Sequence, residues 1–394
     1  MTDETNGEKN GQVNRDPLAH LVVLELANIL AGPMTGMFLA ELGARVIKVE
    51  NPRTNGDPTR GWKLPSEPTD TDVSSYFSCA NWGKESIAVD LTTQGGRELV
   101  HDLVRRCDIV IQSFKPGDDE KLALDYASLR HLNPQMIYAQ ITAYGPEDPR
   151  PGFDAIIQAE SGFTYLNGES DGPPTKMPVA LVDLLLAHQL KEALLLALLK
   201  RERTGEGSYI GTSLLKAATA SLANQATNWL VGGEIPKRMG SEHPNIAPYG
   251  TIYTTRDGRE LVLAVGTDRQ FKAFAAAIDL PELAEDPRFD SNRERVVHRD
   301  ELNQRLRVRI GGIDRTPLLK SLESHKVPFG LVNDMREVFE QPQSQALVLD
   351  GVVGGVRIRG VRSYVWDGDI APDRALTAPP IFNEHRQQVL DFIE

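Results

Sequence analysis

The amino-terminal half of the sequence alternates short, largely apolar runs with longer segments in which apolar residues recur every three or four positions. The run 21–26 predicts a strand, the segment from Ala31 to Leu42 predicts a helix, and the run 45–50 predicts a second strand. A strand, a helix and a strand in succession form a βαβ unit, whose right-handed crossover leaves the strands parallel. The chain is therefore expected to build an α/β fold, with helices on the faces of a parallel sheet.

The same alternation continues as far as residue 144. Further strands are expected at 86–91, 108–114 and 136–144, and further helices at 92–106 and 126–132. Thr92 or Thr93 is placed to cap the first of these helices, because a threonine hydroxyl accepts hydrogen bonds from free backbone N–H groups.

The character of the sequence changes after Gly205. Residues 250–265 alternate in a way that predicts a hairpin, with Asp257-Gly258 as its turn. Helices are expected at 269–278, 292–308 and 316–325, and a terminal helix is expected from about Asn383. The predicted segments are a disordered tail at 1–17, the first part of a large domain at 18–235, a smaller α+β domain at 240–340, and a C-terminal segment at 345–394 that returns to the large domain.

Composition and charge exclude several classes of function. The net charge of −12 over 394 residues disfavours binding to nucleic acid or to acidic membrane surfaces, since both need a basic face. Cys79 and Cys107 are the two cysteines and lie far apart in the sequence, which indicates neither a disulfide framework nor a zinc site. A reducing cytoplasm is the expected location.

Targeting and membrane segments are not expected either. Residues 1–17 are polar and acidic, unlike a signal peptide. The most apolar run, 184–199, is interrupted by His188, Gln189, Lys191 and Glu192 and is shorter than the ~20 residues that a membrane span needs. We interpret this run as a buried core helix.

The first strand-to-helix turn argues against common nucleotide-binding motifs. Residues 27–33 read Ala-Asn-Ile-Leu-Ala-Gly-Pro, with a single glycine in place of Gly-x-Gly-x-x-Gly. Binding of a nicotinamide or flavin dinucleotide therefore loses its main support. No phosphate-binding Walker loop is present, which disfavours nucleotide hydrolysis.

A series of short motifs, in a fixed order, carries a resemblance to one family. They are Ala31-Gly32-Pro33, 42–50, 56–62, Asn81 with Lys84, 86–91, 113–117, 141–145, 152–154, 178–183, 203–207, Arg238 with Gly240, His243-Pro244, Pro248-Tyr249 and Glu384-His385. The series resembles the class III CoA-transferases, the superfamily of formyl-CoA transferase, carnitine CoA-transferase and 2-methylacyl-CoA racemase. It extends over about residues 18–390, almost the whole chain.

The resemblance implies a fold and a chemistry. A Rossmann-like large domain is expected, together with an interlocked homodimer in which each chain forms a ring around the other. The substrates implied are an acyl-CoA and a small carboxylate, with no metal and no cofactor beyond the coenzyme A thioester. A single aspartate is expected to attack that thioester.

Asp183 falls at the position of that aspartate, after 178–182 and directly before the apolar run 184–199. From the residues alone, an aspartate at such a junction is a helix N-cap. The resemblance implies a covalent nucleophile, and the two roles are compatible. A helix N-terminus is expected to keep the carboxylate ionised, and its N–H groups can support a neighbouring oxyanion.

The resemblance also implies coenzyme A-binding residues. The candidates are Asn28, Leu30, Ala31, Arg53, Lys121, Thr142 and Tyr144, with Arg60 as a further basic candidate. Each has a structural alternative: Gly32-Pro33 can simply open a helix, Lys121 can be a solvated surface lysine, and Thr142 and Tyr144 can pack at a strand end. Ligands of parallel sheets gather at such strand ends, so both interpretations stand.

Departures from the family pattern narrow the activity. Residues 240–245 read Gly-Ser-Glu-His-Pro-Asn rather than the glycine-rich loop of formyl-CoA transferases, which argues against formyl or oxalyl transfer. Phe153 stands where the racemase branch has a histidine, and racemisation needs a proton acceptor on each face of the α-carbon. His188 and His243 are the substitutes available, although each also reads as a structural histidine.

The expected activity is transfer of CoA from an acyl-CoA to a carboxylate, through an aspartyl anhydride and an aspartyl-CoA thioester. The stretch 238–249 resembles members that handle succinyl-CoA and C4–C5 dicarboxylates, with Arg238 or His243 holding the second carboxylate. Two alternatives remain at this point: a 2-methylacyl-CoA racemase or epimerase, and a non-catalytic CoA-binding protein.

Overall fold

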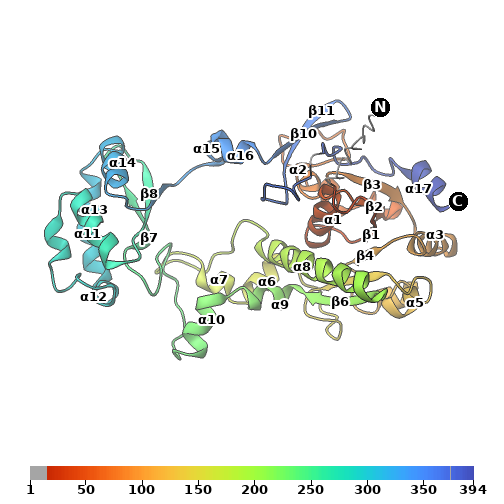
Figure 1. Cartoon of the computed structure of the whole chain (residues 1–394), viewed down its shortest axis with the longest axis horizontal. Coiled ribbons are helices and arrows are strands. Elements are labelled where there is room, and N and C mark those ends of the chain that lie inside the picture. The colour runs from red at the N-terminus through yellow and green to blue at the C-terminus, as the bar shows by residue number, and fades with distance from the viewer. Residues whose placement is uncertain (1–15, 373) are drawn as a thin grey trace, which may run out of the picture. The chain divides into compact units, whose positions relative to one another are not determined.

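The computed structural model describes residues 16–372 and 374–394, which divide into two compact units. Unit 1 comprises the described residues up to Ile157, Ala180–Ser221 and Ala346–Glu394. Unit 2 comprises Gln158–Val179 and Leu222–Gln345. Figure 1 labels their helices and strands.

This division differs from the predicted domain limits. Residues 158–179 and 222–235 were expected in the large domain but group with unit 2. Contacts of the first segment contribute to the difference, because Arg238 donates to the carbonyl of Tyr165 and Gln158 bonds to the backbone of Met177. Residues 1–15 of the predicted tail lie outside the described residues, whereas Asp16 accepts a backbone hydrogen bond in a turn before the first strand.

Unit 1 is built on a parallel sheet. Within the described residues its strands are β1 (Val22–Leu26), β2 (Arg45–Glu50), β3 (Lys84–Ala88), β4 (Ile109–Gln112), β5 (Ile137–Thr142) and β6 (Ser208–Ser213). Their order is β3-β2-β1-β4-β5-β6, and all adjacent pairs are parallel. This is the doubly wound, Rossmann-like order. Strands β1 to β3 are added toward one edge of the sheet and β4 to β6 toward the other, so the order reverses between β1 and β4. The predicted fold class is confirmed.

The helices of unit 1 cover both faces of this sheet (Figure 1). They are α1 (Ala31–Glu41), α2 (Ser75–Ser78), α3 (Gln94–Val104), α4 (Asp118–Leu122), α5 (Tyr126–Arg130), α8 (Leu181–Thr204), α9 (Leu214–Ala220) and α17 (Arg386–Ile393), with single 3₁₀ turns at Pro52–Thr54 and Pro58–Gly61. Leu24 and Ile47 pack against Val100 and Leu103 of α3 and Val389 of α17. Helix α1 packs along α8 instead. A hairpin of β10 (Val348–Val353) and β11 (Val356–Val361) completes the unit.

Most predicted boundaries of unit 1 agree with the structure to within two residues. Thr93 caps α3 through its hydroxyl, as one of the two expected threonines. The run 184–199 lies inside the long helix α8. Strand β6 (Ser208–Ser213) was not predicted. It is an edge strand of the sheet, and its residues mostly alternate between half-buried and exposed instead of forming an apolar run.

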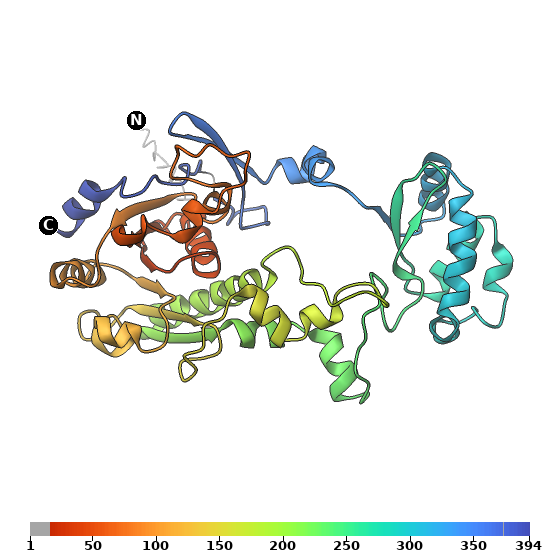
Figure 2. The same ribbon diagram turned by 180° about the vertical axis from the view of Figure 1, so that it is seen from behind.

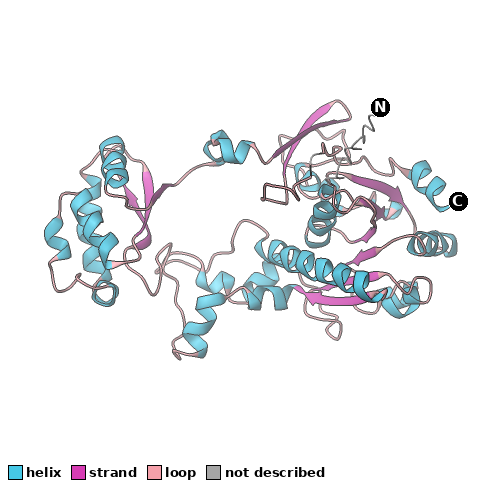
Figure 3. Cartoon of the chain, in the orientation of Figure 1, coloured by secondary structure: helices cyan, strands magenta, loops and turns pink. Residues whose placement is uncertain are grey.

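Unit 2 contains a small antiparallel sheet packed against helices, as Figure 3 shows by secondary structure and Figure 2 from behind. Its strands are β7 (Tyr249–Thr254), β8 (Glu260–Ala264) and β9 (Phe329–Leu331). Its helices are α7 (Phe163–Leu166), α10 (Ala223–Leu230), α11 (Asp268–Ala277), α12 (Asn292–Val297), α13 (Arg299–Gly311), α14 (Arg315–Ser324), α15 (Met335–Glu340) and α16 (Pro342–Gln345), with a 3₁₀ turn at Pro281–Ala284. Helix α6 (Asp154–Glu160) begins in unit 1 and ends in unit 2.

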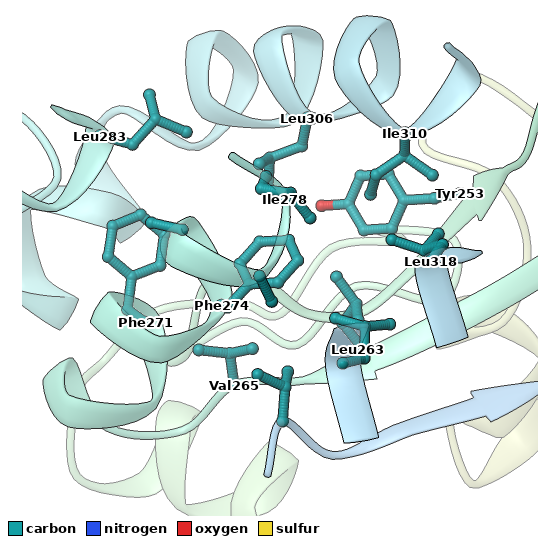
Figure 4. Close-up of a cluster of buried hydrophobic side chains, with 14 of the residues drawn as sticks. Tyr253, Leu263, Val265, Phe271, Phe274, Ile278, Leu283, Leu306, Ile310 and Leu318 are labelled. Carbon is teal, nitrogen blue, oxygen red and sulfur yellow. The ribbon is translucent and has the colours of Figure 1, made fainter. Parts of the chain in front are cut away.

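The core of unit 2 lies between the sheet and these helices. Figure 4 shows Phe274 of α11 close to Ile278, and Phe271, Leu263, Leu306 and Ile310 belong to the same buried cluster. The predicted hairpin is confirmed as β7 and β8. The single helix predicted at 292–308 is wrong, since the chain leaves helical geometry at His298 and forms α12 and α13. In the described part of the chain, no helix is long and apolar enough to cross a membrane.

Candidate functional site

Two helices of unit 1 begin at the same edge of the sheet. Helix α1 follows β1 and helix α8 precedes β6, and both strands run in the same direction. Both N-termini must therefore lie at the carboxyl edge of the sheet, and α1 packs along α8. At the adjacent reversal point, the N–H of Asn28 after β1 donates to Oγ of Ser113 after β4, at 3.3 Å. Ligands of doubly wound folds bind in this crevice.

Asp183 lies in the first turn of α8, at its third helical residue. The N-cap is Ala180, which provides no side-chain hydrogen bond, so the prediction that Asp183 is the N-cap is wrong. The physical reason is that the helix begins earlier than the apolar run, at Leu181. The carboxyl group of Asp183 is thereby released from capping.

Asp154 supplies the acceptor that the helix end needs. It is buried at the start of α6, and its Oδ1 accepts the N–H of Val182 at 2.9 Å. The first N–H groups of a helix have no intrahelical partner, so a carboxylate beside them is stabilising. Asp154 therefore performs the task that sequence reasoning gave to Asp183.

The two carboxyl groups interact electrostatically. Burial, and next the negative charge of Asp154, raise the pKa of Asp183 to about 7. The expectation that the helix N-terminus keeps Asp183 fully ionised is therefore wrong at neutral pH, because desolvation outweighs it. A carboxylate with a raised pKa is a stronger base, and strongly shifted groups cluster at functional sites.

Tyr76 of α2 belongs to the same environment, although sequence reasoning did not identify it. Burial, followed by the charge of Asp183, raises the pKa of Tyr76 to about 12. The phenol therefore stays protonated and can act as a hydrogen-bond donor. The ring centroids of Tyr76 and Trp62 lie 5.0 Å apart in a T-shaped arrangement. The sequence signal that could have identified Tyr76 is its position between two motifs of the family resemblance, 56–62 and Asn81.

The other predicted CoA-binding residues near the carboxyl edge of the sheet differ in how far they are buried. Leu30 and Ala31 are buried at the start of α1, whereas Asn28 is exposed. Thr142 is buried at the end of β5, and its hydroxyl donates to the carbonyl of Thr212 at 3.1 Å. Tyr144 follows, with the guanidinium of Arg150 3.9 Å from its ring centroid.

The basic candidates behave differently from one another. Arg53 is exposed and donates to the hydroxyl of Thr92, and Lys121 is exposed and pairs with Asp118 at 2.8 Å. Arg60 is instead 4% exposed, with 2.6 Å between its guanidinium and the carboxylate of Glu50. That buried pair commits Arg60 to the structure of the loop rather than to a phosphate.

Arg238 and His243 lie in unit 2. Arg238 donates to the carbonyl of Tyr165 at 3.0 Å and lines a hollow of about 740 Å³ together with Asn245 and Arg299. Nδ1 of His243 accepts the N–H of Asn245 at 3.1 Å. Burial, and next the charge of Arg299, lower the pKa of His243, so its ring is neutral at physiological pH.

The remaining candidates lie on the surface. Phe153 is 59% exposed directly before Asp154. His188 is exposed on α8, where burial of part of its ring and the neighbouring Lys191 lower its pKa. Among the residues that the structure describes, no group of three or more His, Cys, Asp and Glu side chains is arranged to hold a metal ion.

Comparison with known proteins identifies relatives over the whole chain. The model of CoA-transferase family III matches residues 18–386. A protein of Agrobacterium fabrum named succinate–glutarate CoA-transferase is 40% identical over 408 aligned positions, which cover 100% of this chain and 98% of that protein. A mouse protein named succinyl-CoA:glutarate CoA-transferase is 34% identical, over 95% of this chain and 86% of its own length. The crystal structure of a CaiB/BaiF family protein from Brucella suis superposes with a TM-score of 0.81, at 39% identity over 96% of this chain and 99% of that one.

Proposed function

The chain belongs to CoA-transferase family III, and on this premise we propose that it transfers CoA from an acyl-CoA to a carboxylic acid with Asp183 as the covalent nucleophile. The observation that carries the proposal is the environment of Asp183. Its carboxyl group lies in the first turn of α8, has no capping duty, and has a pKa raised to about 7 by burial and by Asp154. A partly desolvated, basic carboxylate is suited to attack on a thioester.

The first half of the reaction loads CoA onto the enzyme. A carboxylate oxygen of Asp183 attacks the thioester carbonyl, the C–S bond breaks, and CoA thiolate leaves an acyl-aspartyl anhydride. The thiolate then attacks the aspartyl carbonyl and expels the donor acid as its carboxylate. The product is an aspartyl-CoA thioester. N–H groups at the start of α8 and the phenol of Tyr76 are the donors available for the developing oxyanion.

The second half reverses these steps with a different acid. The acceptor carboxylate attacks the aspartyl thioester, which gives a new anhydride and free thiolate. Attack of the thiolate on the acceptor's carbonyl then forms the new acyl-CoA and regenerates the Asp183 carboxylate. Each thioester is exchanged for one of similar energy, so the cycle requires no ATP, metal or additional cofactor.

We propose C4–C5 dicarboxylates, with succinyl-CoA as the donor, as the substrates. Relatives named for succinate or succinyl-CoA and glutarate support this choice, as does the stretch 238–249. The second carboxylate of such a substrate needs a cationic partner, and a guanidinium binds carboxylates in a bidentate manner. Arg238 is our candidate, with His243 as an uncharged neighbour in the sequence.

The decisive experiment combines a substrate screen with a trap for the intermediate. Purified protein is incubated with succinyl-CoA and a set of mono- and dicarboxylic acids, and new CoA esters are identified by mass spectrometry. Glutarate is expected to react faster than acetate or propionate. Addition of hydroxylamine during turnover should inactivate the enzyme and leave a hydroxamate on Asp183.

The matched variants are Asp183→Asn and Asp102→Asn. Asp102 is a half-exposed aspartate of α3 that pairs with Arg105, so its amide variant controls for handling and folding. Asp183→Asn should lower kcat by at least ~10⁴-fold while the fold is retained, since an amide cannot form the anhydride. Activity of Asp183→Asn within roughly tenfold of the wild type would refute the covalent role.

A further inference from the structure

The segment that joins β1 to α1 has an unusual backbone. Ile29 has φ +73°, in the left-handed region. A β-branched residue rarely adopts this conformation, because its Cβ approaches the backbone too closely. Such strain persists where surrounding contacts determine it, and it is concentrated at functional sites. The segment Asn28–Leu30 borders the crevice at the carboxyl edge of the sheet.

Three buried side chains hold this segment in place. The carboxylate of Asp57 accepts the N–H of Ile29, at 3.1 Å to Oδ2 and 3.4 Å to Oδ1. Nζ of Lys48 donates to the carbonyl of Ala27 at 2.7 Å, just before the segment. Nζ of Lys84 donates to the carbonyl of Pro33 at 2.8 Å, just after it.

The same side chains neutralise one another. Lys48 forms ion pairs of 3.0 Å with both Glu25 and Asp57, and Lys84 pairs with Glu25 at 2.7 Å. The side chains of all four residues are fully buried. Despite burial, which opposes it, the positive charge of Lys48 keeps the pKa of Asp57 below its usual value. Asp57 therefore remains a charged acceptor for the Ile29 N–H.

Stability alone is a weak reason for such a cluster. Replacement of buried ion pairs by well-packed apolar side chains is often neutral or stabilising, because desolvation offsets the attraction. Geometry gives a better reason, since Asp57 bonds to a backbone group of the segment and the two lysines bond to backbone carbonyls on either side of it. Lysines and a carboxylate supply hydrogen bonds that apolar side chains cannot.

We propose that Lys48, Lys84, Glu25 and Asp57 are positioning residues, which hold Asn28–Leu30 in its strained conformation so that this segment shapes the acyl-CoA site. The inference rests on the proposed function. Loss of the Asp57 acceptor should allow Ile29 to relax to a right-handed backbone. The relaxed segment would then fit the reacting thioester poorly, although none of the four residues contacts it.

The main test is a rescue experiment in the full-length enzyme, measured as kcat and KM for succinyl-CoA. Asp57→Ala, which removes the acceptor of the Ile29 N–H, should lower kcat/KM by roughly thirtyfold or more. Ile29→Gly alone is the reference for the double variant, because glycine adopts positive φ without strain. In the double variant, Ile29→Gly should recover at least about fivefold of the loss. If Asp57 only stabilised the fold, Ile29→Gly would not restore kcat/KM in the double variant.

A second variant keeps the buried charges intact. Ile29→Pro removes the N–H that Asp57 accepts and fixes φ near −65°, so it should lower kcat/KM by ~100-fold or more. It should also lower the melting temperature, because the native φ is +73° and the N–H is hydrogen-bonded. Glu41→Gln is the matched control: Glu41 is a buried carboxylate at the far end of α1, and its variant should leave kcat/KM unchanged.

Each outcome has one meaning. Ile29→Pro with unchanged kcat/KM, or folded Asp57→Ala with unchanged kcat/KM, overturns the positioning role. A double variant no better than Asp57→Ala also overturns it. Wild-type protein without transferase activity refutes the proposed function instead, which separates the two failures.

Discussion

At the scale of single residues, Asp154 and Asp183 divide two tasks that sequence reasoning assigned to one carboxylate. Asp154 accepts the free N–H of Val182, and Asp183 is left without a capping role. The cost of this arrangement is a pair of neighbouring negative charges in a buried place, which raises the pKa of Asp183. The raised pKa makes the Asp183 carboxylate a stronger base, which favours the attack on the thioester that we propose.

The pH dependence of the reaction should reveal the raised pKa. The carboxylate is the attacking form, so kcat/KM should rise with pH through about 7 and level off above it. Asp154→Asn retains an oxygen acceptor for Val182 but removes the like charge, so the midpoint should move to lower pH, by up to roughly one unit. Profiles of both proteins with succinyl-CoA measure the shift. An unchanged midpoint would mean that Asp154 does not act on Asp183.

The same carboxyl group should influence stability. Its folded pKa, about 7, lies above the ordinary value of 3.8, so its contribution to stability is present below pH 4 and is lost as pH rises through 7. Asp183→Asn should therefore stabilise the free protein at pH 8, on the order of 1–2 kcal/mol, and much less at pH 4. Urea unfolding at the two pH values measures this, with Asp102→Asn as control. Destabilisation at pH 8 would contradict the assignment.

Phe153 leads to a separate expectation about protons. An exposed phenylalanine directly before Asp154 cannot accept a proton from the α-carbon of a substrate. We expect no incorporation of deuterium at that carbon when a 2-methylacyl-CoA is incubated with the enzyme in deuterated buffer, as followed by mass spectrometry. Rapid incorporation that disappears in His188→Ala or His243→Ala would instead indicate a racemase.

At the scale of elements, helix α1 is buried along almost its whole length between the sheet and α8. Glycines permit this approach. A Cβ at Gly32 would overlap the side chain of Ala27, and a Cβ at Gly36 would overlap the carboxylate of Glu25. Two lysines hold Glu25 beneath the helix, so that carboxylate has little freedom to move.

Gly36→Ala should therefore destabilise the protein, by roughly 2–4 kcal/mol, although alanine is the better helix former. Gly95→Ala in α3 is the matched control, since a Cβ there meets no atom within 4 Å. That variant should be stabilised by roughly 0.5–1 kcal/mol. Thermal and urea unfolding of both variants give the comparison. Equal effects of the two substitutions would show that Glu25 can move away from α1.

At the scale of the whole molecule, apolar side chains are exposed in both units. Leu196 on α8 is 67% exposed, and Leu230 and Val231 at the end of α10 are 75% and 86% exposed. Large apolar side chains with this exposure are candidates for an interface between chains. They motivate our proposal, taken from the family resemblance, that two copies form an intertwined homodimer.

An intertwined dimer should not dissociate into folded monomers on dilution. Its interface is expected to exceed the ~1,600 Å² of ordinary complexes by a wide margin. Sedimentation velocity from micromolar to nanomolar concentration should give one dimeric species with unchanged activity. Leu196→Glu, compared with an exposed polar control such as Glu192→Gln, should lower the yield of dimer. A folded, active monomer at nanomolar concentration would refute the proposal.

The sequence by itself determined the secondary structure of unit 1 and its parallel sheet. Strands β1 and β2 and helix α1 follow from the local alternation of apolar residues, because neighbours in the chain decide which face of an element is buried. The ordered motifs likewise placed Asp183 at the start of α8. Edge strand β6 and the break at His298 were missed, since neither has a strong local signal.

Only the tertiary structure decided the electrostatics of the candidate site. Asp154 reaches Val182 across 28 positions of the chain, and Lys84 reaches Glu25 across 59. Such partners cannot be read from local periodicity, because the fold brings them together through space. The pKa of Asp183 depends on burial and on the charge of Asp154 in another helix, and the N–H of Ile29 is bonded to an acceptor in a different loop. The sequence thus placed the candidate residues along the chain, whereas packing decided their hydrogen-bond partners, their burial and their pKa values.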